Sequence, residues 1–332
     1  RRRHTRFKCD WSSDVCSSDL DLDIEERQVI FGDDGRIAGI VPRARYDSHR
    51  LIEEFMIAAN VCAAESLEAK RLPCLYRVHE TPDPAKVDAL RQVLDGLGYR
   101  LAKGQVLRPR HFMDVLEWSE ATPYRHLVHA LVLRAQSLAI YSAANIGHFG
   151  LALTRYAHFT SPIRRYADLL VHRSLIAGLA LGDGGLRPTD AAGFDAVAEH
   201  ISDTERRAAA AEREAVDRYM VAYMADKVGA RFPGRISGVI KSGLFVTLDG
   251  LGADGFVPIG SLPGGDYYRH DERHHRLEGQ RTRRRFGLGD PIEVRLAEAQ
   301  PVTGSLTFQV LDSGRGAPPP GRGEKPRHFK HS

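Results

Sequence analysis

Apolar positions near the start of the chain change from a strand-like pattern to a helical one. Residues 21–42 are rich in β-formers around a GDDG turn at 32–35, which predicts a β-hairpin. Residues 48–72 repeat apolar side chains three and four apart, which predicts a long helix. The side chains expected on the packing side of this helix are Leu51, Ile52, Phe55, Met56, Ala59 and Cys62.

Extended and helical patterns then alternate. Residues 72–83, LPCLYRVHETPD, are expected to be extended and to end at prolines. Residues 86–99 predict a helix that stops at Gly96 or Gly98. Residues 126–143 predict another, ending before the glycines of NIGHFGLAL.

The stretch HFTSPIRRYADLLVHR at 158–173 places two arginines directly after Ser-Pro. Ser161 is a favoured N-cap and proline suits the first helical position, so Arg164 and Arg165 are expected in the first turn of a helix running to about Gly178. The helix dipole makes each cation there unfavourable by roughly 0.3–1 kcal/mol, and Asp168 offsets part of this cost. Free amides and a guanidinium together indicate an anion site, with a surface helix and its ion pair as the alternative.

The longest helix is predicted over 202–228, with a capping box from Ser202 to Glu205 and a stop at Gly229. Glu205 and Glu212 are seven residues apart on one face, beside an arginine stripe at the same spacing. By itself this pattern indicates a salt-bridged helix surface.

Short strands separated by glycines follow, and five of them predict a small barrel of the OB type. Leu244, Val246 and Leu248 alternate with Phe245, so the aliphatic set is expected inside and Phe245 outside. An outward aromatic on such a strand can stack on a base, worth roughly 1–3 kcal/mol. Packing of Phe245 against a neighbouring helical domain is the alternative.

Residues 267–286, YYRHDERHHRLEGQRTRRRF, interleave arginines with aromatic residues. This composition suits a single-stranded nucleic acid, and a solvated loop is an equal alternative. His270 and His274 are four apart, but no cysteine or glutamate pair nearby supports a metal site.

Composition narrows the class of protein. The 332 residues allow two or three domains, and a net charge of +4 means that nucleic-acid binding must rest on local patches. There is no membrane-length apolar run, no secretory signal and no CxxC among four cysteines, so a cytoplasmic protein is expected. Residues 1–20, with the repetitive SSDVCSSDL, are expected to be foreign or disordered, and the basic Pro/Gly-rich residues 312–332 to be disordered.

Four motifs in order resemble the RNase II/RNase R family of exoribonucleases: LIEEFMIAANVCAA, LYRVHETPDPAK, HFGLALTRYAHFTSPIRRYADLLVHR and SDTERRAAAAER. The segment with GLFVTL and GFVPI resembles the S1 domain that follows the catalytic domain there, and the basic tail suits the RNase R branch. The resemblance implies an α+β fold. Residues 21–229 would form the C-terminal part of an RNB-type nuclease domain, mostly helical with short strands, and residues 230–311 a five-stranded OB-fold (S1) barrel.

The resemblance also implies functions for individual residues. The family hydrolyses single-stranded RNA processively from the 3′ end, releasing nucleoside 5′-monophosphates. Arg164 matches the arginine that contacts the scissile phosphate, with Ser161, Arg165 and Tyr166 expected at or near neighbouring phosphates. The motifs imply three further RNA-contacting positions, Glu53, Asn60 and Glu205, and Glu53 is preferred over Glu54 because it aligns with Asn60. The outward aromatic of the barrel, Phe245, is expected to contact RNA as well.

One family feature has no match. The Mg²⁺-binding aspartates of the family form a clustered segment, which Asp21, Asp23, Asp33 and Asp34 do not reproduce. The ligands are therefore expected upstream, and this chain is expected to be a C-terminal fragment that is inactive alone. The expected partner is single-stranded RNA, and the protein is expected to be a monomer. The sequence does not identify any protein partner. The alternative is a non-catalytic S1-domain RNA-binding protein on a degenerate nuclease scaffold.

Overall fold

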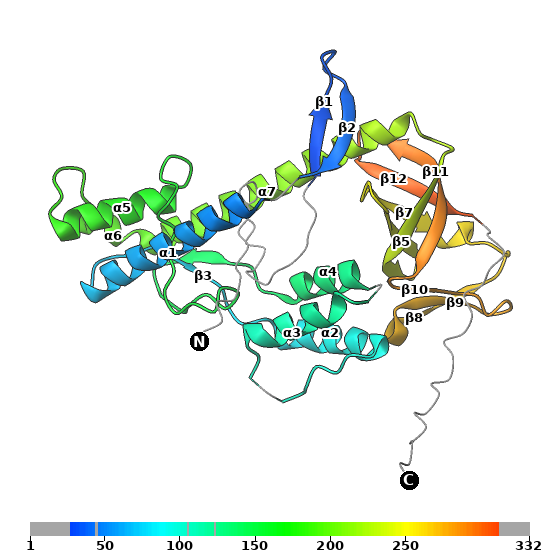
Figure 1. The fold of residues 1–332 in the computed structure, drawn as a ribbon, viewed down its shortest axis with the longest axis horizontal. Coiled ribbons are helices and arrows are strands. Elements are labelled where there is room, and N and C mark those ends of the chain that lie inside the picture. Colours follow the sequence, from blue (N-terminus) through cyan, green and yellow to red (C-terminus); the bar gives the residue numbers. More distant parts are fainter. Residues whose placement is uncertain (1–26, 44–45, 105, 123, 312–332) are drawn as a thin grey trace, which may run out of the picture. The chain divides into compact units, whose positions relative to one another are not determined.

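The computed structural model describes residues 27–43, 46–104, 106–122 and 124–311. They form two compact units, divided between Asp217 and Arg218. The first is mostly helical with short strands and the second is almost wholly β (Figure 1), which confirms the expected fold class. The expectations for residues 1–20 and 312–332, and those for Asp21 and Asp23, lie outside the described residues.

The predicted hairpin is confirmed. Strands β1 (Arg27–Phe31) and β2 (Ile37–Pro42) pair antiparallel. The turn closes with the Gly32 amide donating to the Arg36 carbonyl at 2.8 Å. Gly35 has a φ of 73°, a left-handed conformation that favours glycine.

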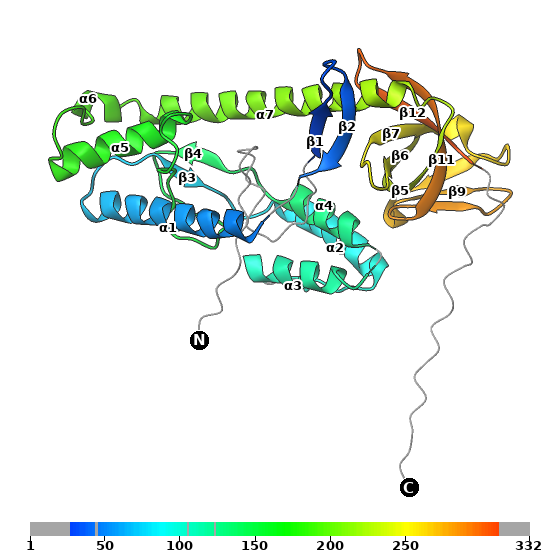
Figure 2. The ribbon, with the colours of Figure 1, turned by 45° about the horizontal axis from the view of Figure 1, so that its top comes forward.

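A two-stranded ribbon, β3 (Tyr76–Val78) with β4 (Ile140–Ser142), lies at the centre of the first unit. Because side chains alternate along a strand, its two faces pack against different sets of helices, with α5 in both sets. Tyr76 and Val78 pack with helices α1 (Asp47–Ala69) and α5 (Tyr166–Leu179). Tyr141 packs with α5 and the start of α7 (Phe194–Ala225), so that α7 and α1 lie on opposite sides of the ribbon (Figure 2).

The buried face of α1 differs from the predicted one. Its buried residues are Glu53, Ile57, Asn60, Ala63, Ala64 and Leu67. The predicted packing side is largely exposed: Leu51 by 57%, Ile52 by 45% and Phe55 by 63%, with Cys62 exposed and Met56 and Ala59 half-buried. The prediction failed because it ranked positions by hydrophobicity, whereas two polar residues of this helix are buried.

Helices α2 (Pro84–Leu97), α3 (Pro109–Ser119) and α4 (Arg125–Ala135) share one apolar core. Gly98 ends α2 in a left-handed conformation, as predicted. Helix α3 was not predicted. The helix predicted over 126–143 ends at Ala135, because Ile140–Ser142 pairs with β3 instead.

The start of the longest helix was predicted wrongly. Helix α7 begins at Phe194, so Ser202 lies inside it and is no cap. The buried Ser202 hydroxyl donates to the Ala198 carbonyl at 2.7 Å and accepts from the Tyr141 amide at 3.0 Å. A short helix, α6 (Pro188–Ala191), precedes α7 and was not predicted. No helix within the described ranges is long and apolar enough to cross a membrane.

The second unit contains the predicted five-stranded barrel. Its strands are β5 (Arg231–Ile240), β6 (Gly243–Leu248), β7 (Asp254–Pro258), β11 (Pro291–Gln300) and β12 (Ser305–Val310). The sheet closes in the order β11-β12-β7-β6-β5. Leu244, Val246 and Leu248 are buried, whereas Phe245 is 42% exposed, which confirms the predicted alternation.

Residues 267–287 form a second, three-stranded antiparallel sheet between β7 and β11. Its strands are β8 (Tyr268–Asp271), β9 (Arg276–Gly279) and β10 (Arg285–Gly287). Tyr268, Leu277 and Phe286 are buried. The alternative of a solvated loop is therefore wrong for this segment.

Candidate functional site

The segment Ser161–Arg164 forms a turn ahead of α5 rather than its first helical turn. Helix α5 begins at Tyr166, with extended backbone at Arg165 as its N-cap. The Ser161 carbonyl accepts from the amides of Arg164 (3.3 Å) and Arg165 (3.1 Å). The predicted placement of both arginines inside the helix is therefore wrong, and so is the predicted capping by Ser161.

Asp168 determines this geometry. Its fully buried carboxylate accepts from the Ser161 amide at 2.7 Å. It also accepts from Nε of Arg165 at 2.8 Å and from Nη2 at 2.9 Å. The same carboxylate therefore holds the start of the turn and the guanidinium that follows it, and a bidentate pair of this kind is geometrically specific.

Arg165 and Arg164 consequently differ in environment. The Arg165 side chain is only 12% exposed and is engaged by Asp168. Arg164 is exposed, and its neighbours on the turn are Ile163, which is fully exposed, and Tyr166, which is 49% exposed. The turn thus presents Arg164 at the surface of the first unit while Arg165 braces it from below.

Helix α1 contributes Asn60 to the segment that leads into this turn. The buried Asn60 amide donates to the Tyr156 hydroxyl at 3.0 Å, and its oxygen accepts from the Phe159 amide at 2.8 Å. Glu53 lies on the same buried face of α1, whereas Glu54 is exposed. The predicted alignment of Glu53 with Asn60 is confirmed, because both are buried on the same side of α1.

Glu205 joins α7 to the central ribbon. Its carboxylate accepts from Nη1 of Arg77 at 2.6 Å, and the Arg77 side chain is only 2% exposed. The Arg77 guanidinium also lies over the Tyr141 ring, 4.6 Å from its centre. The interpretation of Glu205 as part of an ion-paired helix surface is therefore wrong, because its partner is a buried strand residue.

His158 lies between the ribbon and the turn. The Tyr141 hydroxyl is 2.9 Å from its Nδ1. Burial holds the pKa of His158 well below its ordinary value, and the positive charges of Arg165, Arg77 and Arg164 act in the same direction. The imidazole is therefore neutral near pH 7.

Two further buried histidines lie close together, His79 on the segment after β3 and His148 in the GHFG segment at 147–150, with their rings 5.1 Å apart. His79 Nδ1 accepts from the Gly150 amide at 2.7 Å, which leaves Nε2 to donate to the Ser137 carbonyl at 2.7 Å. Both nitrogens are satisfied by the neutral form. Burial lowers the pKa of His79 and lowers that of His148 still further.

The barrel supplies an aromatic pair of its own. The rings of Phe245 on β6 and Phe256 on β7 lie 5.3 Å apart. The two residues face each other in the antiparallel register. The partly exposed ring of Phe245 on the outside of the barrel is thus available for stacking.

The family resemblance implies a metal, which the described residues do not fit. Asp33 and Asp34 lie in the hairpin turn and are exposed. Within residues 27–311, masked positions excepted, no group of three or more His, Cys, Asp or Glu side chains could hold an ion.

Sequence reasoning missed four members of the network: Arg77, Tyr141, Tyr156 and His158. The available signal was a charged or polar residue within an apolar stretch, as in LYRVH. Such a residue is buried in a folded protein only when it is paired. The partners of Arg77, which are Glu205 and Tyr141, lie more than 60 residues away in sequence, so local spacing could not identify them.

The arrangement agrees with the similarity to known proteins. Residues 16–180 match the RNB domain, and residues 225–304 match the S1 RNA binding domain. Ribonuclease R of Aquifex aeolicus is 42% identical over 293 residues, which are 88% of this chain and 41% of that protein. Ribonuclease R of Escherichia coli (strain K12) is 38% identical over 304 residues, which are 89% of this chain and 37% of that protein.

Solved structures agree as well. The apo form of Mycoplasma genitalium RNase R superposes with a TM-score of 0.81 at 26% identity, covering 88% of this chain and 46% of that one. The same protein in complex with ribose methylated single-stranded RNA superposes with a TM-score of 0.80 over the same shares. The chain spans roughly 40% of the length of these curated relatives.

Proposed function

Because the chain belongs to the RNB–S1 family of ribonucleases that includes ribonuclease R, we propose that it takes part in 3′-to-5′ hydrolysis of single-stranded RNA. The observation that carries this proposal is the dual use of Asp168, which fixes Ser161 and Arg165 and leaves Arg164 exposed on a braced turn.

Arg164 is proposed to meet the phosphodiester that is cut. A phosphoryl group gains negative charge as a nucleophile adds, and a guanidinium already in place stabilises that gain. The turn supports such preorganisation, since its backbone is held at both Ser161 and Arg165. Arg165, with its guanidinium engaged by Asp168, is proposed mainly as a brace, while Ser161 and Tyr166 flank the neighbouring phosphates.

The remaining contacts differ in how directly they can act. Glu53 is proposed to contact the terminal nucleotide. Asn60 is proposed to act through the 156–159 segment, since both ends of its amide are used there. Glu205 is proposed to line the same region while balancing the buried charge of Arg77. Phe245 is proposed to stack on a base of the incoming strand.

Mg²⁺ is the cofactor that the family resemblance implies, where it would activate water and neutralise the phosphate. Its aspartate segment has no counterpart in residues 21–35. We therefore propose that the chain alone binds RNA without cleaving it, and none of the contacts proposed for its residues depends on a metal.

A direct test compares the chain alone with a fusion in which the segment preceding the matched region of Aquifex aeolicus ribonuclease R is joined at residue 21. A 5′-labelled single-stranded oligoribonucleotide with Mg²⁺ is the substrate. We expect the chain alone to bind and the fusion to produce short end products. A well-folded fusion that binds the oligonucleotide but never shortens it would support the alternative of a non-catalytic RNA-binding protein.

A further inference from the structure

The three-stranded sheet beside the barrel has two unlike faces. Its register aligns Arg269, Glu278 and Arg285 across β8, β9 and β10, and aligns Asp271 with Arg276 one row further. The intervening residues Tyr268, Leu277 and Phe286 are buried on the opposite face. Alternation along the strands therefore places the charged set on the outward face.

The outward face is dominated by arginines around one carboxylate. The Glu278 side chain is only 12% exposed. It lies 3.4 Å from Arg276, 3.9 Å from Arg283 and 3.3 Å from Arg285. Arg269 is exposed in the neighbouring strand and Arg281 in the turn between β9 and β10. Positive groups thus outnumber the carboxylates that face them.

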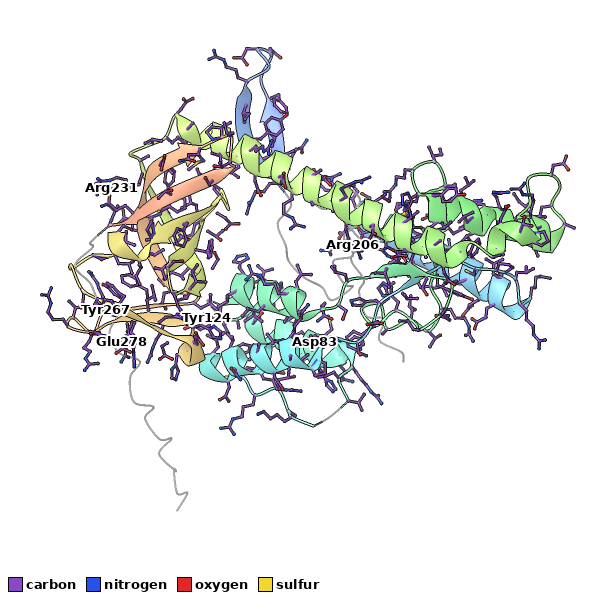
Figure 3. All side chains as sticks on the ribbon, turned by 180° about the vertical axis from the view of Figure 1, so that it is seen from behind. Asp83, Tyr124, Arg206, Arg231, Tyr267 and Glu278 are labelled. Atoms are coloured by element: carbon purple, nitrogen blue, oxygen red, sulfur yellow. The ribbon has the colours of Figure 1, made fainter. Side chains whose placement is uncertain are left out.

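An aromatic ring lies at the edge of the same face. Tyr267 is 73% exposed and directly precedes β8, and its carbonyl accepts from the Gln280 amide at 2.9 Å, which continues the pairing with β9. Alternation along this extended segment points its side chain the same way as that of Arg269. Figure 3 shows Tyr267 and Glu278 close together on this sheet, whereas Arg231 lies on the barrel, away from it.

The turn beside this face is firmly held. The Asp266 carboxylate accepts from the amides of Arg281 (3.1 Å) and Thr282 (2.7 Å) and from the Thr282 hydroxyl at 2.6 Å. These bonds lower the pKa of Asp266 to about 2, with the Thr282 hydroxyl as the largest cause. The surface is therefore preformed, and its ordering costs little on binding.

We infer that the outward face of β8, β9 and β10 is a second binding surface for single-stranded RNA, separate from the Phe245 face of the barrel. Its arginines contact backbone phosphates and Tyr267 stacks on a base. The inference rests on the proposed RNA-binding function and adds a docking path to it. Clustered guanidinium groups beside an exposed aromatic ring match the alternation of phosphate and base in a single strand.

The geometry suits an extended strand. Arg269 and Arg285 flank the same central residue, so their backbones are roughly 10 Å apart, which is two interstrand spacings. That separation lets one strand of RNA meet both cations. Exposed guanidinium groups beside an exposed aromatic ring favour a flexible polyanion.

The test measures binding of a fluorescein-labelled 20-nucleotide oligouridylate to the whole chain by anisotropy, from 50 to 300 mM salt. Arg269→Glu with Arg285→Glu should weaken binding about 10-fold or more at 100 mM salt. It should also flatten the dependence of log affinity on log salt by about 0.7 for each phosphate that the variant no longer neutralises. Arg231→Glu reverses one charge, half the change of the double variant, on an exposed barrel residue and should alter affinity less than about 2-fold.

Further variants separate binding from folding. Arg269→Lys with Arg285→Lys keeps the charge and should retain most of the affinity, and Tyr267→Ala should weaken binding roughly 5-fold or more. Glu278→Gln removes the central negative charge and should tighten binding if the face meets phosphates.

The inference is overturned if the charge-reversed protein, folded by circular dichroism, binds as tightly as the parent while Phe245→Ala binds more weakly. That result would leave the proposed RNA binding intact and assign the arginines to neutralising Glu278. If the unaltered chain fails to bind the oligouridylate, the proposed function and this inference both fail.

Discussion

At the scale of single residues, Asp168 is the group in the candidate site whose buried charge most needs partners. A fully buried carboxylate is tolerated only when its oxygens are hydrogen-bonded and its charge is matched. Asp168 meets both conditions through the Ser161 amide and the bidentate Arg165 guanidinium. The exposed position of Arg164 thus depends on a residue that is itself fully buried.

Asp168→Asn should therefore destabilise the first unit by about 3 kcal/mol, because it leaves the largely buried Arg165 guanidinium without its counter-charge. The free energy of unfolding in urea, followed by circular dichroism, measures the loss. Asp203→Asn provides the control, since Asp203 pairs with Arg206 on the exposed surface of α7 and should cost no more than about 0.5 kcal/mol. Equal effects of the two substitutions would contradict the role assigned to Asp168.

Arg164→Ala separates chemistry from binding in the fusion with the Aquifex aeolicus segment. If this guanidinium stabilises the phosphate only as charge develops, kcat should fall at least ~10²-fold while RNA affinity stays nearly unchanged. Single-turnover cleavage and anisotropy on the same preparation give the two quantities. Ile163→Ala, on the same turn, should change neither. Reduced affinity with preserved turnover would mean that Arg164 binds the strand rather than the transition state.

At the scale of elements, hydrophobic periodicity predicted the hairpin, most of the helices and the barrel, because each depends on local pattern. It failed where distant groups override local preference. Ile140–Ser142 became a strand by pairing with Tyr76–Val78. Helix α1 buried Glu53 and Asn60 rather than Leu51 and Phe55.

The candidate site shows the same division. Its residue types could be predicted from the motifs, and the Arg165–Asp168 pair from their spacing of three residues. The start of α5 could not be predicted from the sequence, because the Asp168 carboxylate accepts from the Ser161 amide and stabilises a turn there instead of a helix. The partner of Glu205 could not be predicted either, since Arg77 lies in a different element far away in sequence.

Closure of the barrel provides an element-scale prediction. Where β12 meets β7, an added Cβ at Gly255 would lie 2.3 Å from the Phe308 ring and 2.9 Å from the Leu306 carbonyl. Gly255→Ala should therefore destabilise the second unit by about 1–3 kcal/mol. Gly260→Ala is the matched control, because nothing lies within 4 Å of its added Cβ. Thermal unfolding distinguishes the two, and a harmless Gly255→Ala would show that the barrel seam is not tightly packed.

At the scale of the whole molecule, one buried network ties the separate motifs together. Tyr141 contacts both Arg77 and His158, and the charges of Arg164 and Arg165 help to lower the pKa of His158. His79 and His148 belong to the same interior. Because three buried histidines are held neutral near arginines, the stability of the folded chain should depend on pH.

The sign of this sensitivity follows from the lowered pKa values of His79, His148 and His158. An unfolded histidine has a pKa near 6.5, so above that pH both states are neutral and the stability is fully present. As the pH falls below about 6.5, the unfolded chain takes up protons that the folded unit excludes. The free energy of unfolding then decreases by up to about 1.4 kcal/mol per pH unit for each histidine.

His158→Gln should make this decline shallower between pH 6.5 and 5, even if it lowers stability at pH 7.5 by removing the contact with the Tyr141 hydroxyl. Urea unfolding across this range measures the slope. His126→Gln, on the exposed side of α4, should leave the slope as it is. An undiminished slope in His158→Gln would mean that this imidazole accepts a proton in the folded chain.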